Sequence, residues 1–312
     1  MNSTDLMFFA AVAETGGIGR AAARLNTVQS NVTGRIRALE QALRVPLFHR
    51  GSRGVTMTRA GERLLPYALQ VGQLLAEARH ALLAEGEPRG PLRIGAMETT
   101  AALRLPGPLA DFAARHPDVD IELETGPTEL LIARVLDRSL EGAFVAGPVT
   151  QADLVAIPVL TEELVLVAHP AVGDLAALLD RLARARDAKV LVFRAGCSYR
   201  RRLEQFLARQ GLVHVRRMEF GTLDGILGCV AAGLGVTLVP RAVAEPAHRA
   251  GRVSIHPVPD GDGRARTLLV HRADARPSAA FARFAEQIRT AFPDSQCEHP
   301  VPARTVPSAT AG

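Results

Sequence analysis

The hydrophobic pattern of this 312-residue chain changes near Gly90, and this change constrains the fold more than any other feature. Before Gly90, apolar residues recur every three or four positions, as they do along amphipathic helices. After it, short apolar runs that suit strands alternate with helical stretches, which is typical of parallel sheets covered by helices. Roughly 200 residues are many for one such sheet, so we expect two α/β lobes with a cleft between them.

The elements expected beyond Gly90 are short. The predicted strands are residues 92–95, 119–124, 143–146, 164–168, 190–193, 213–216, 236–239 and 267–271. The predicted helices are residues 101–115, 129–136, 175–184, 200–210, 223–232 and 278–292. Residues 293–312 are rich in proline and poor in apolar side chains, so we expect this tail to be disordered.

Residues 5–50 show the pattern of three short helices. The first helix is indicated by a stripe of apolar residues from Leu6 to Ala13, and it ends at Gly16-Gly17. An alanine-rich helix follows over residues 19–25, and a third helix begins near Val28. The third helix buries the side that carries Val32 and Ile36. Two helices joined by a tight turn predict a helix-turn-helix in an all-α head, and residues 49–55 suit a β-hairpin wing.

This head is strongly basic, with eight arginines against three acidic residues among residues 1–60. Such a segment on a nearly neutral body is the charge distribution expected for binding to DNA phosphates, because neutralised phosphates release counterions. A solvated basic face without a partner is the alternative. The residues expected near base edges are Gln29, Ser30, Thr33 and Arg37, and those expected mainly at phosphates are Arg35, Arg50 and Arg53.

A long helix is expected from the N-cap candidate Thr58 to about residue 85. Its apolar residues are spaced alternately by four and three positions, which is the heptad pattern of a coiled coil. We expect it to pair two chains, and packing against its own domain is the alternative. Pro66 should kink it. The seam comprises Leu64, Ala68, Val71, Leu75, Ala78 and Leu82.

Several motifs resemble those of the LysR-type transcriptional regulators in order and spacing. They include Phe9-Ala10-Ala11-Val12-Ala13-Glu14, Ala21-Ala22-Ala23-Arg24-Leu25, Arg35-Ile36-Arg37-Ala38-Leu39-Glu40, Val45-Pro46-Leu47-Phe48, Thr58-Arg59-Ala60-Gly61 and Ala232-Gly233-Leu234-Gly235. The family often carries arginine at the position of Gly34 and serine at that of Val28, so its base preference cannot be transferred. Residues 193–201 resemble a narrower, polyamine-responsive enterobacterial subgroup.

The resemblance implies a homodimer or homotetramer on double-stranded DNA with dyad symmetry. It also implies a sensing domain folded like periplasmic binding proteins. The expected parts are a winged helix-turn-helix (residues 1–61), a dimerising linker (58–90), an effector-binding domain with lobe one (91–161 and 267–292) and lobe two (162–266), and the tail (293–312). RNA polymerase is a further expected partner, whereas we expect no membrane contact and no cofactor.

A small effector is expected beyond the carboxyl ends of the strands, between the lobes. Glu98 favours an amine on this effector, and Arg194 with Asp224 would hold its other end. The alternative is that Glu98 and Arg194 only pair with each other. By family similarity Thr128 and Gly147 lie on the same side. The full expected set is Glu98, Thr99, Thr100, Thr128, Gly147, Arg194, Ser198, Thr222 and Asp224.

Other function classes find little support in the sequence. It contains no Gly-x-Ser-x-Gly elbow, phosphate loop or metal-spaced histidine or cysteine pair, so we do not expect an enzyme. The N-terminus lacks a secretory signal, so we expect a cytoplasmic protein. The alternative to metabolite sensing is a thiol redox switch at Cys197, at the start of a predicted helix, with Cys229 or Cys297 as the resolving thiol.

Overall fold

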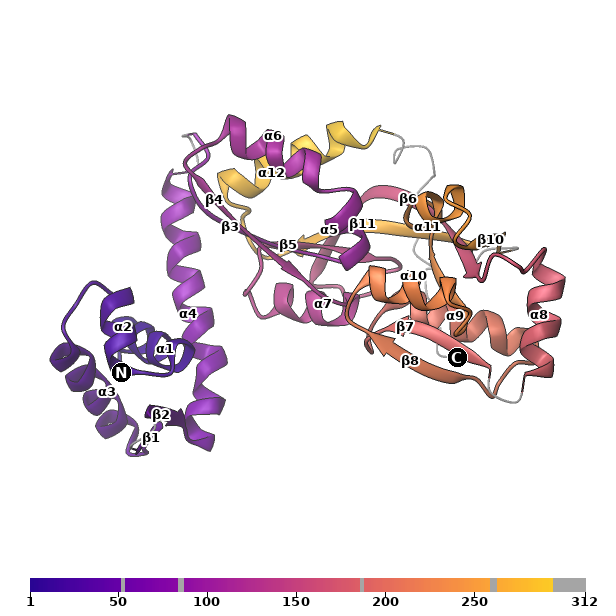
Figure 1. The fold of residues 1–312 in the computed structure, drawn as a ribbon. Coiled ribbons are helices and arrows are strands. Elements are labelled where there is room, and N and C mark those ends of the chain that lie inside the picture. Colours follow the sequence, from indigo (N-terminus) through magenta and orange to yellow (C-terminus); the bar gives the residue numbers. More distant parts are fainter. Residues whose placement is uncertain (52–53, 84–86, 186–187, 259–262, 294–312) are drawn as a thin grey trace, which may run out of the picture.

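A computed structural model describes residues 1–51, 54–83, 87–185, 188–258 and 263–293. The chain forms a small head, a long helix α4 (Arg59–Leu83), and a domain of two α/β lobes, with α4 standing between the head and the first lobe (Figure 1). The head contains α1 (Ser3–Thr15), α2 (Ile18–Arg24), α3 (Gln29–Leu43), β1 (Phe48–Gly51) and β2 (Gly54–Met57).

Local sequence explains where the helices of the head begin and end. The Asn2 side chain accepts a hydrogen bond from the Asp5 amide at 2.8 Å and caps α1. Gly16 ends α1 in the left-handed region, at φ 63°, which glycine adopts without steric cost. Along α3, Val32 and Ile36 are buried against α1 and α2, so the predicted helix-turn-helix and the hairpin wing β1–β2 are confirmed.

The start of α4 is held by Thr58, as predicted. The Thr58 hydroxyl accepts a hydrogen bond from the Gly61 amide at 3.1 Å and donates one to the Pro46 carbonyl at 2.7 Å. Pro66 lies inside the helix. One face of α4 packs on the head, where Ala68 is buried in the core that α1 and α3 share.

Lobe one is a sheet with helices on both faces. Alternate residues of β5 show this arrangement, because Phe144 faces α6 and α12 whereas Ala143 and Val145 face α7. Its elements are β3 (Gly90–Ala96), α5 (Glu98–Leu103), α6 (Pro106–Arg115), β4 (Val119–Thr125), α7 (Thr128–Leu136), β5 (Gly142–Ala146) and α12 (Ala279–Ala291).

Lobe two has the same layered construction. Leu191 on β7 packs toward α10 and α11, and its neighbours Val190 and Val192 pack toward α8 and α9. Its elements are α8 (Leu175–Arg184), β7 (Lys189–Phe193), α9 (Ser198–Arg209), β8 (Arg216–Phe220), α10 (Leu223–Ala231), β9 (Thr237–Pro240), α11 (Arg241–Arg249) and β10 (Ser254–Pro257).

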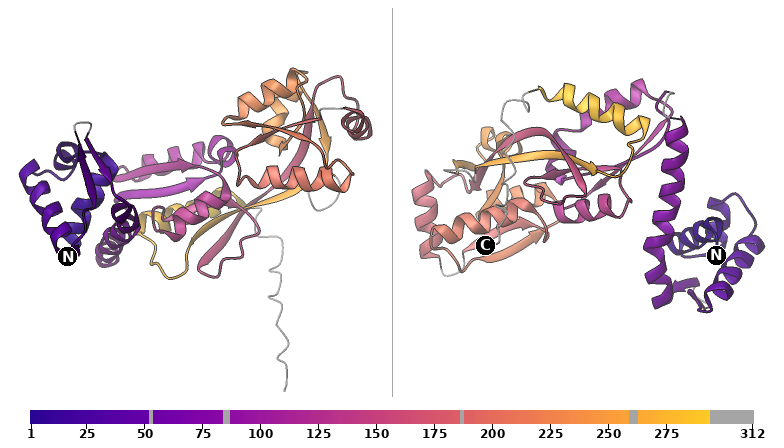
Figure 2. Two further views of the ribbon diagram at one scale, coloured as in Figure 1. Left: turned by 90° about the horizontal axis from the view of Figure 1, so that it is seen from below. Right: turned by 180° about the vertical axis from the view of Figure 1, so that it is seen from behind.

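Two long strands, β6 (Leu154–Ala168) and β11 (Arg264–Arg272), cross from one lobe to the other (Figure 2). They pair antiparallel along their length, and the register shifts between Thr267 and Leu268. The larger sheet therefore has the order β10-β6-β11-β5-β3-β4, with β9 also paired to β6. The connection between the lobes is a two-stranded ribbon, and its register shift lies beside the expected boundary at residues 266 and 267.

Several predicted elements are placed differently in the structure. The helix expected over residues 101–115 is two helices, because Pro106 begins α6. The strand expected at residues 213–216 lies instead at Arg216–Phe220, and Val213 is 65% exposed. Strand β10 and helix α11 were not predicted, and the sheets are mixed, because β6 and β11 run antiparallel to their neighbours. No helix in the described ranges is both long and apolar enough to span a bilayer.

Candidate functional site

The outer side of α3 presents the residues that were expected at base edges. Gln29, Ser30 and Arg37 are exposed, and Thr33 is half-buried. Arg37 forms no ion pair with any residue that the structure describes. A Cβ at Gly34 would meet no atom within 4 Å, so this position is open on the same side of the helix. This face is free to approach a DNA groove.

Arg35 is placed differently from Arg37. Its guanidinium pairs with Asp5 at 3.0 Å and lies over the Phe8 ring, inside the head. The expectation that Arg35 lies mainly at phosphates is therefore revised, because its charge is already engaged by α1. Arg53 and the side chain of Arg50 lie outside the described residues.

The expected dimer seam divides into two parts along α4. Leu64, Ala68 and Val71 pack on the core of the head, where Ala68 is buried and the other two are half-buried. Farther along, Leu75 is 40% exposed, its neighbour Leu74 is 49% exposed, and Ala78 is exposed. The side chain of Leu82 lies outside the described set. The second half of α4 therefore exposes apolar side chains that a partner helix could cover.

A cavity of about 460 Å³ lies between the two lobes. It is lined by residues that follow β3, β4 and β7 and by the end of β8, which is the position where ligands of α/β sheets bind. Five expected residues line it: Glu98, Thr99, Thr128, Arg194 and Ser198.

The charges in this cavity come from opposite lobes. Glu98, at the start of α5, and Arg194, after β7, are the charged residues among those that line it. In the described part of the chain they form no ion pair with each other. The buried hydroxyl of Ser198, in the first turn of α9, has no hydrogen-bond partner among the residues that the structure describes. The cavity therefore offers an acidic group on one side and donors on the other.

A buried chain of hydrogen bonds links the lobes and begins at Thr99 and Tyr199 in the wall of the cavity. The Tyr199 hydroxyl lies 3.4 Å from the Thr99 hydroxyl and donates to Glu162 Oε2 at 3.1 Å. Arg104 Nε donates to Glu162 Oε1 at 3.2 Å. Burial, with a smaller contribution from the Glu162 charge, raises the pKa of the Tyr199 phenol, so this phenol keeps its proton.

Four expected residues lie outside the cavity lining. Thr222 caps α10 by accepting from the Gly225 amide at 3.3 Å, and Asp224 lies in the first turn of the same helix. Thr100 is buried without a partner for its hydroxyl, and the Gly147 carbonyl lies 3.5 Å from Arg202. Asp224 is thus not among the residues that line the cavity, and its expected position opposite Glu98 stays a prediction.

Sequence reasoning missed Tyr199 and Glu162. Tyr199 stands beside Arg200 and Arg201, and Glu162 stands between Thr161 and Glu163, so both lie in polar sequence that resembles a solvated surface. The one available signal was the position of Tyr199 directly after Ser198 at the end of a strand, where ligand-binding residues collect.

Cys197 also lines the cavity. Burial raises its pKa, and the helix amides and Arg200 lower it by less. This is opposite to the direction expected for a redox switch. Cys197 packs with the core under α8 and α9, whereas Cys229 packs with the core under α10 and α11, on the other face of the sheet. Cys297 lies outside the described residues.

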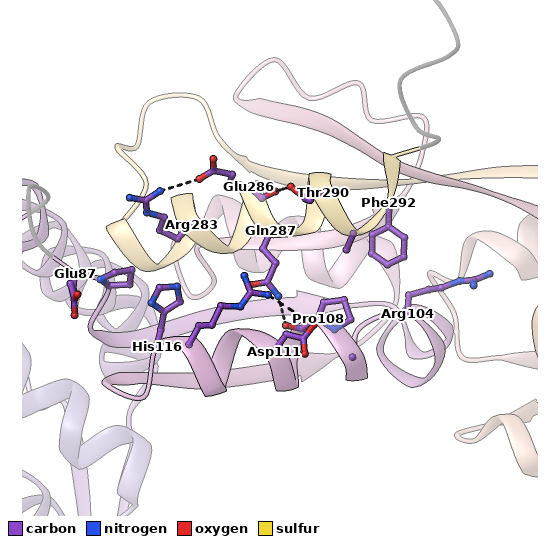
Figure 3. A pocket seen from close by; sticks show the side chains of 14 residues that line it. Glu87, Arg104, Pro108, Asp111, His116, Arg283, Glu286, Gln287, Thr290 and Phe292 are labelled. Carbon is purple, nitrogen blue, oxygen red and sulfur yellow. Dashed lines mark hydrogen bonds and ion pairs between the residues drawn. The ribbon is translucent and has the colours of Figure 1, made fainter.

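A larger and more open groove, of about 1010 Å³, lies between α6 and α12 (Figure 3). Gln287 donates to the Pro108 carbonyl across it at 2.7 Å, and Arg283 pairs with Glu286 along its edge. Arg104 stands at one end, directed away from Gln287 in Figure 3. Its acidic and basic groups largely pair with each other, so the interlobe cavity is the better candidate for a small ligand.

Comparison with known sequences supports the same division of the chain. Residues 3–62 match the family described as "Bacterial regulatory helix-turn-helix protein, lysR family", and residues 85–293 match "LysR substrate binding domain". The chain is 41% identical to the transcriptional regulator GltR of Bacillus subtilis, over 94% of this chain and 97% of that protein. It is 38% identical to CzcR of Bacillus cereus, over 92% and 97% respectively.

Solved structures with the same fold include one protein in complex with DNA. A cysteine variant of full-length OxyR from Pseudomonas aeruginosa superposes with a TM-score of 0.70 at 22% identity, covering 96% of this chain and 99% of that one. Full-length CbnR complexed with its target DNA gives 0.65 at 23% identity, with 93% and 100% covered. These structures share the fold, and the two family models together with the 41% identity to GltR show that the chain belongs to the LysR family of DNA-binding transcriptional regulators, which are not enzymes.

Proposed function

We propose that this regulator responds to a small zwitterion that carries a primary amine, of the size of an amino acid, bound in the interlobe cavity. The observation that carries the proposal is a pair of opposite charges, Glu98 from lobe one and Arg194 from lobe two, that form no ion pair with any described residue. A ligand with one ammonium and one carboxylate group would neutralise both and would bridge the lobes.

The donors near Arg194 favour a carboxylate at that end. The Ser198 hydroxyl is buried and unpaired, and it lies in the first turn of the twelve-residue helix α9. The amides at the start of a helix are unpaired donors that attract anions, so a carboxylate here would receive hydrogen bonds from both. Because Asp224 lies outside the lining, a diamine would find one acidic group instead of two.

Calorimetric titration of the full chain tests this proposal. We expect binding of one or more L-α-amino acids, and weaker or no binding of putrescine and succinate. Glu98→Gln should weaken binding roughly tenfold or more, because the ammonium loses a charged acceptor. Asp224→Asn is the matched control and should leave the affinity unchanged. Binding of dicarboxylates alone, or amine binding indifferent to Glu98→Gln, would overturn the proposal.

We also propose that α3 reads a dyad-symmetric operator as part of a homodimer or homotetramer, and that the protein acts on promoters through RNA polymerase. The open face at Gln29, Thr33 and Arg37 supports direct contact with bases. If Arg37 contacts guanine, Arg37→Ala should cost about 1–3 kcal/mol of binding and relax specificity at one position in each half-site. Operator selection from a random library with both proteins measures this change.

A further inference from the structure

We propose that Glu162, which does not line the cavity, determines which ligands the cavity prefers by fixing the direction of the hydrogen bonds at Thr99. The proposal deepens the proposed function, since it concerns the end of the cavity assigned there to the ammonium group. It rests on the count of protons along the buried chain Arg104, Glu162, Tyr199 and Thr99.

The hydrogen bonds from Arg104 to Thr99 have a defined direction, because each of these side chains can donate only a limited number of protons. Both oxygens of the Glu162 carboxylate accept, one from Arg104 and the other from Tyr199. Arginine can only donate, and a phenol has a single proton to give. Glu162 and Tyr199 are each 3% exposed, so water does not compete for these contacts. The proton of Tyr199 is therefore committed to Glu162.

The committed proton of Tyr199 determines the direction of its hydrogen bond with Thr99. The contact between the Tyr199 and Thr99 hydroxyls, at 3.4 Å, requires one proton, and Tyr199 has none left. Thr99 must donate to Tyr199, so only its lone pairs remain for the cavity that it lines. A ligand N–H satisfies these lone pairs, whereas a carboxylate oxygen placed there would be repelled. Thr99 thus reinforces the preference that its neighbour Glu98 creates.

Glu162→Gln should reverse this direction while keeping the shape of the side chain. Arg104 needs an acceptor, so it retains the amide oxygen of the new residue, and the NH₂ group then faces Tyr199. Tyr199 would accept from this group and turn its proton to Thr99. Thr99 would in turn direct its own proton into the cavity. A side chain that only braced the lobes would produce no such reversal.

Ultraviolet resonance Raman spectroscopy reads the direction without any ligand. The chain has two tyrosines, so Tyr67→Phe leaves Tyr199 as the only tyrosine. The intensity ratio of the tyrosine Fermi doublet is low when the phenol donates and high when it accepts. Tyr199 donates one hydrogen bond and accepts one in both variants, but its acceptor changes from a carboxylate to the Thr99 hydroxyl, so we expect a higher ratio when Glu162→Gln is added to Tyr67→Phe than in Tyr67→Phe alone. An unchanged or lower ratio in the double variant overturns the proposal.

Binding selectivity supplies the second measurement, with L-glutamate and L-2-hydroxyglutarate, and L-leucine and L-2-hydroxyisocaproate, as matched probes. Glu162→Gln should shift the amine-to-hydroxyl affinity ratio toward the hydroxy acid by roughly tenfold. Tyr199→Phe interrupts the chain, so adding Glu162→Gln to it should leave the ratio unchanged. Glu162→Asp keeps a carboxylate and should retain the wild-type preference. A ratio that Glu162→Gln leaves unchanged contradicts the proposal.

The two measurements separate this inference from the proposed function. If the wild-type protein binds no probe but the Raman ratios change as expected, the amino-acid effector is wrong and the role of Glu162 stands. If amino acids bind and the ratios do not change, the effector class stands and the role of Glu162 is wrong.

Discussion

Arg35 Nη1 lies 3.0 Å from Asp5 Oδ1, although the two residues are 30 positions apart in the chain. The pair joins α3 to α1 at the edge of the head, where Asp5 is 8% exposed. The Arg35 guanidinium also lies 5.1 Å from the centre of the Phe8 ring. Two arginines on one helix therefore have different roles, since Arg37, two positions later, extends into solvent.

Arg35→Ala and Arg37→Ala should separate folding from DNA binding. Arg35→Ala leaves the buried Asp5 carboxylate without its partner and should lower the free energy of unfolding of the head by about 1–3 kcal/mol. Arg37→Ala should leave unfolding unchanged and weaken operator binding. Urea denaturation and fluorescence anisotropy on operator DNA measure the two effects. Equal loss of stability in both variants would contradict this assignment.

Gly34→Ala should stabilise the head. Nothing lies within 4 Å of the added Cβ, and alanine favours a helix over glycine by about 0.5–1 kcal/mol. Gly61→Ala is the opposing control in the same domain, because its Cβ would strike the Leu47 carbonyl, a backbone atom that cannot move aside. We expect Gly61→Ala to destabilise by about 1–3 kcal/mol or more. Thermal unfolding that ranks the two variants the other way would refute the packing described for α4.

Assembly should depend on the second half of α4. Leu74→Glu combined with Leu75→Glu places charge on exposed apolar positions and should dissociate the oligomer without loss of helix content. Ala68→Glu instead puts a charge into the core of the head and should unfold it. Sedimentation velocity at micromolar concentration, together with circular dichroism, distinguishes the two results. Native sedimentation of the Leu74, Leu75 double variant would show that the partner helix packs elsewhere.

Stability should fall at alkaline pH through Cys197 and Tyr199. Burial raises the pKa of both groups in the folded state, so the unfolded chain releases their protons first. The stabilisation is complete below the ordinary pKa values, about 8.5 for cysteine and about 10 for tyrosine, and is lost as the pH rises through and above them. Urea unfolding between about pH 7 and 10.5 should show this slope, reduced in Cys197→Ser and in Tyr199→Phe.

The same raised pKa bears on the redox alternative. Few thiolates form at neutral pH in a thiol whose pKa is raised, so iodoacetamide should label Cys197 more slowly than it labels glutathione. Cys197→Ser should retain the transcriptional response to its effector. Rapid labelling, or loss of a peroxide response in Cys197→Ser, would restore the redox switch.

The spacing of apolar residues predicted those helices and strands whose buried side is marked by a regular apolar pattern. Val32 and Ile36 identified the buried side of α3, and the alternation after Gly90 predicted two lobes with a cleft. Periodicity cannot say which surface an apolar stripe meets. Ala68 therefore fitted a coiled-coil seam equally well, although it packs inside the head.

The candidate site was predicted where a polar residue follows a strand, as at Glu98 and Arg194. Glu162 could not be found in this way, because its burial depends on Arg104, 58 positions earlier, and on Tyr199, 37 positions later. The residues next to Glu162 in the sequence do not indicate contacts with such distant residues. The strand expected at residues 213–216 failed for the converse reason, since apolar Val213 remains exposed.

The ribbon of β6 and β11 is the connection between the two lobes. Thr161 pairs with Arg266 toward lobe two, and Ile157 pairs with Leu269 toward lobe one, so both connections are hydrogen-bonded strands. Rotation of one lobe against the other must therefore twist both strands of this ribbon together, since their shared ladder of hydrogen bonds has to be kept.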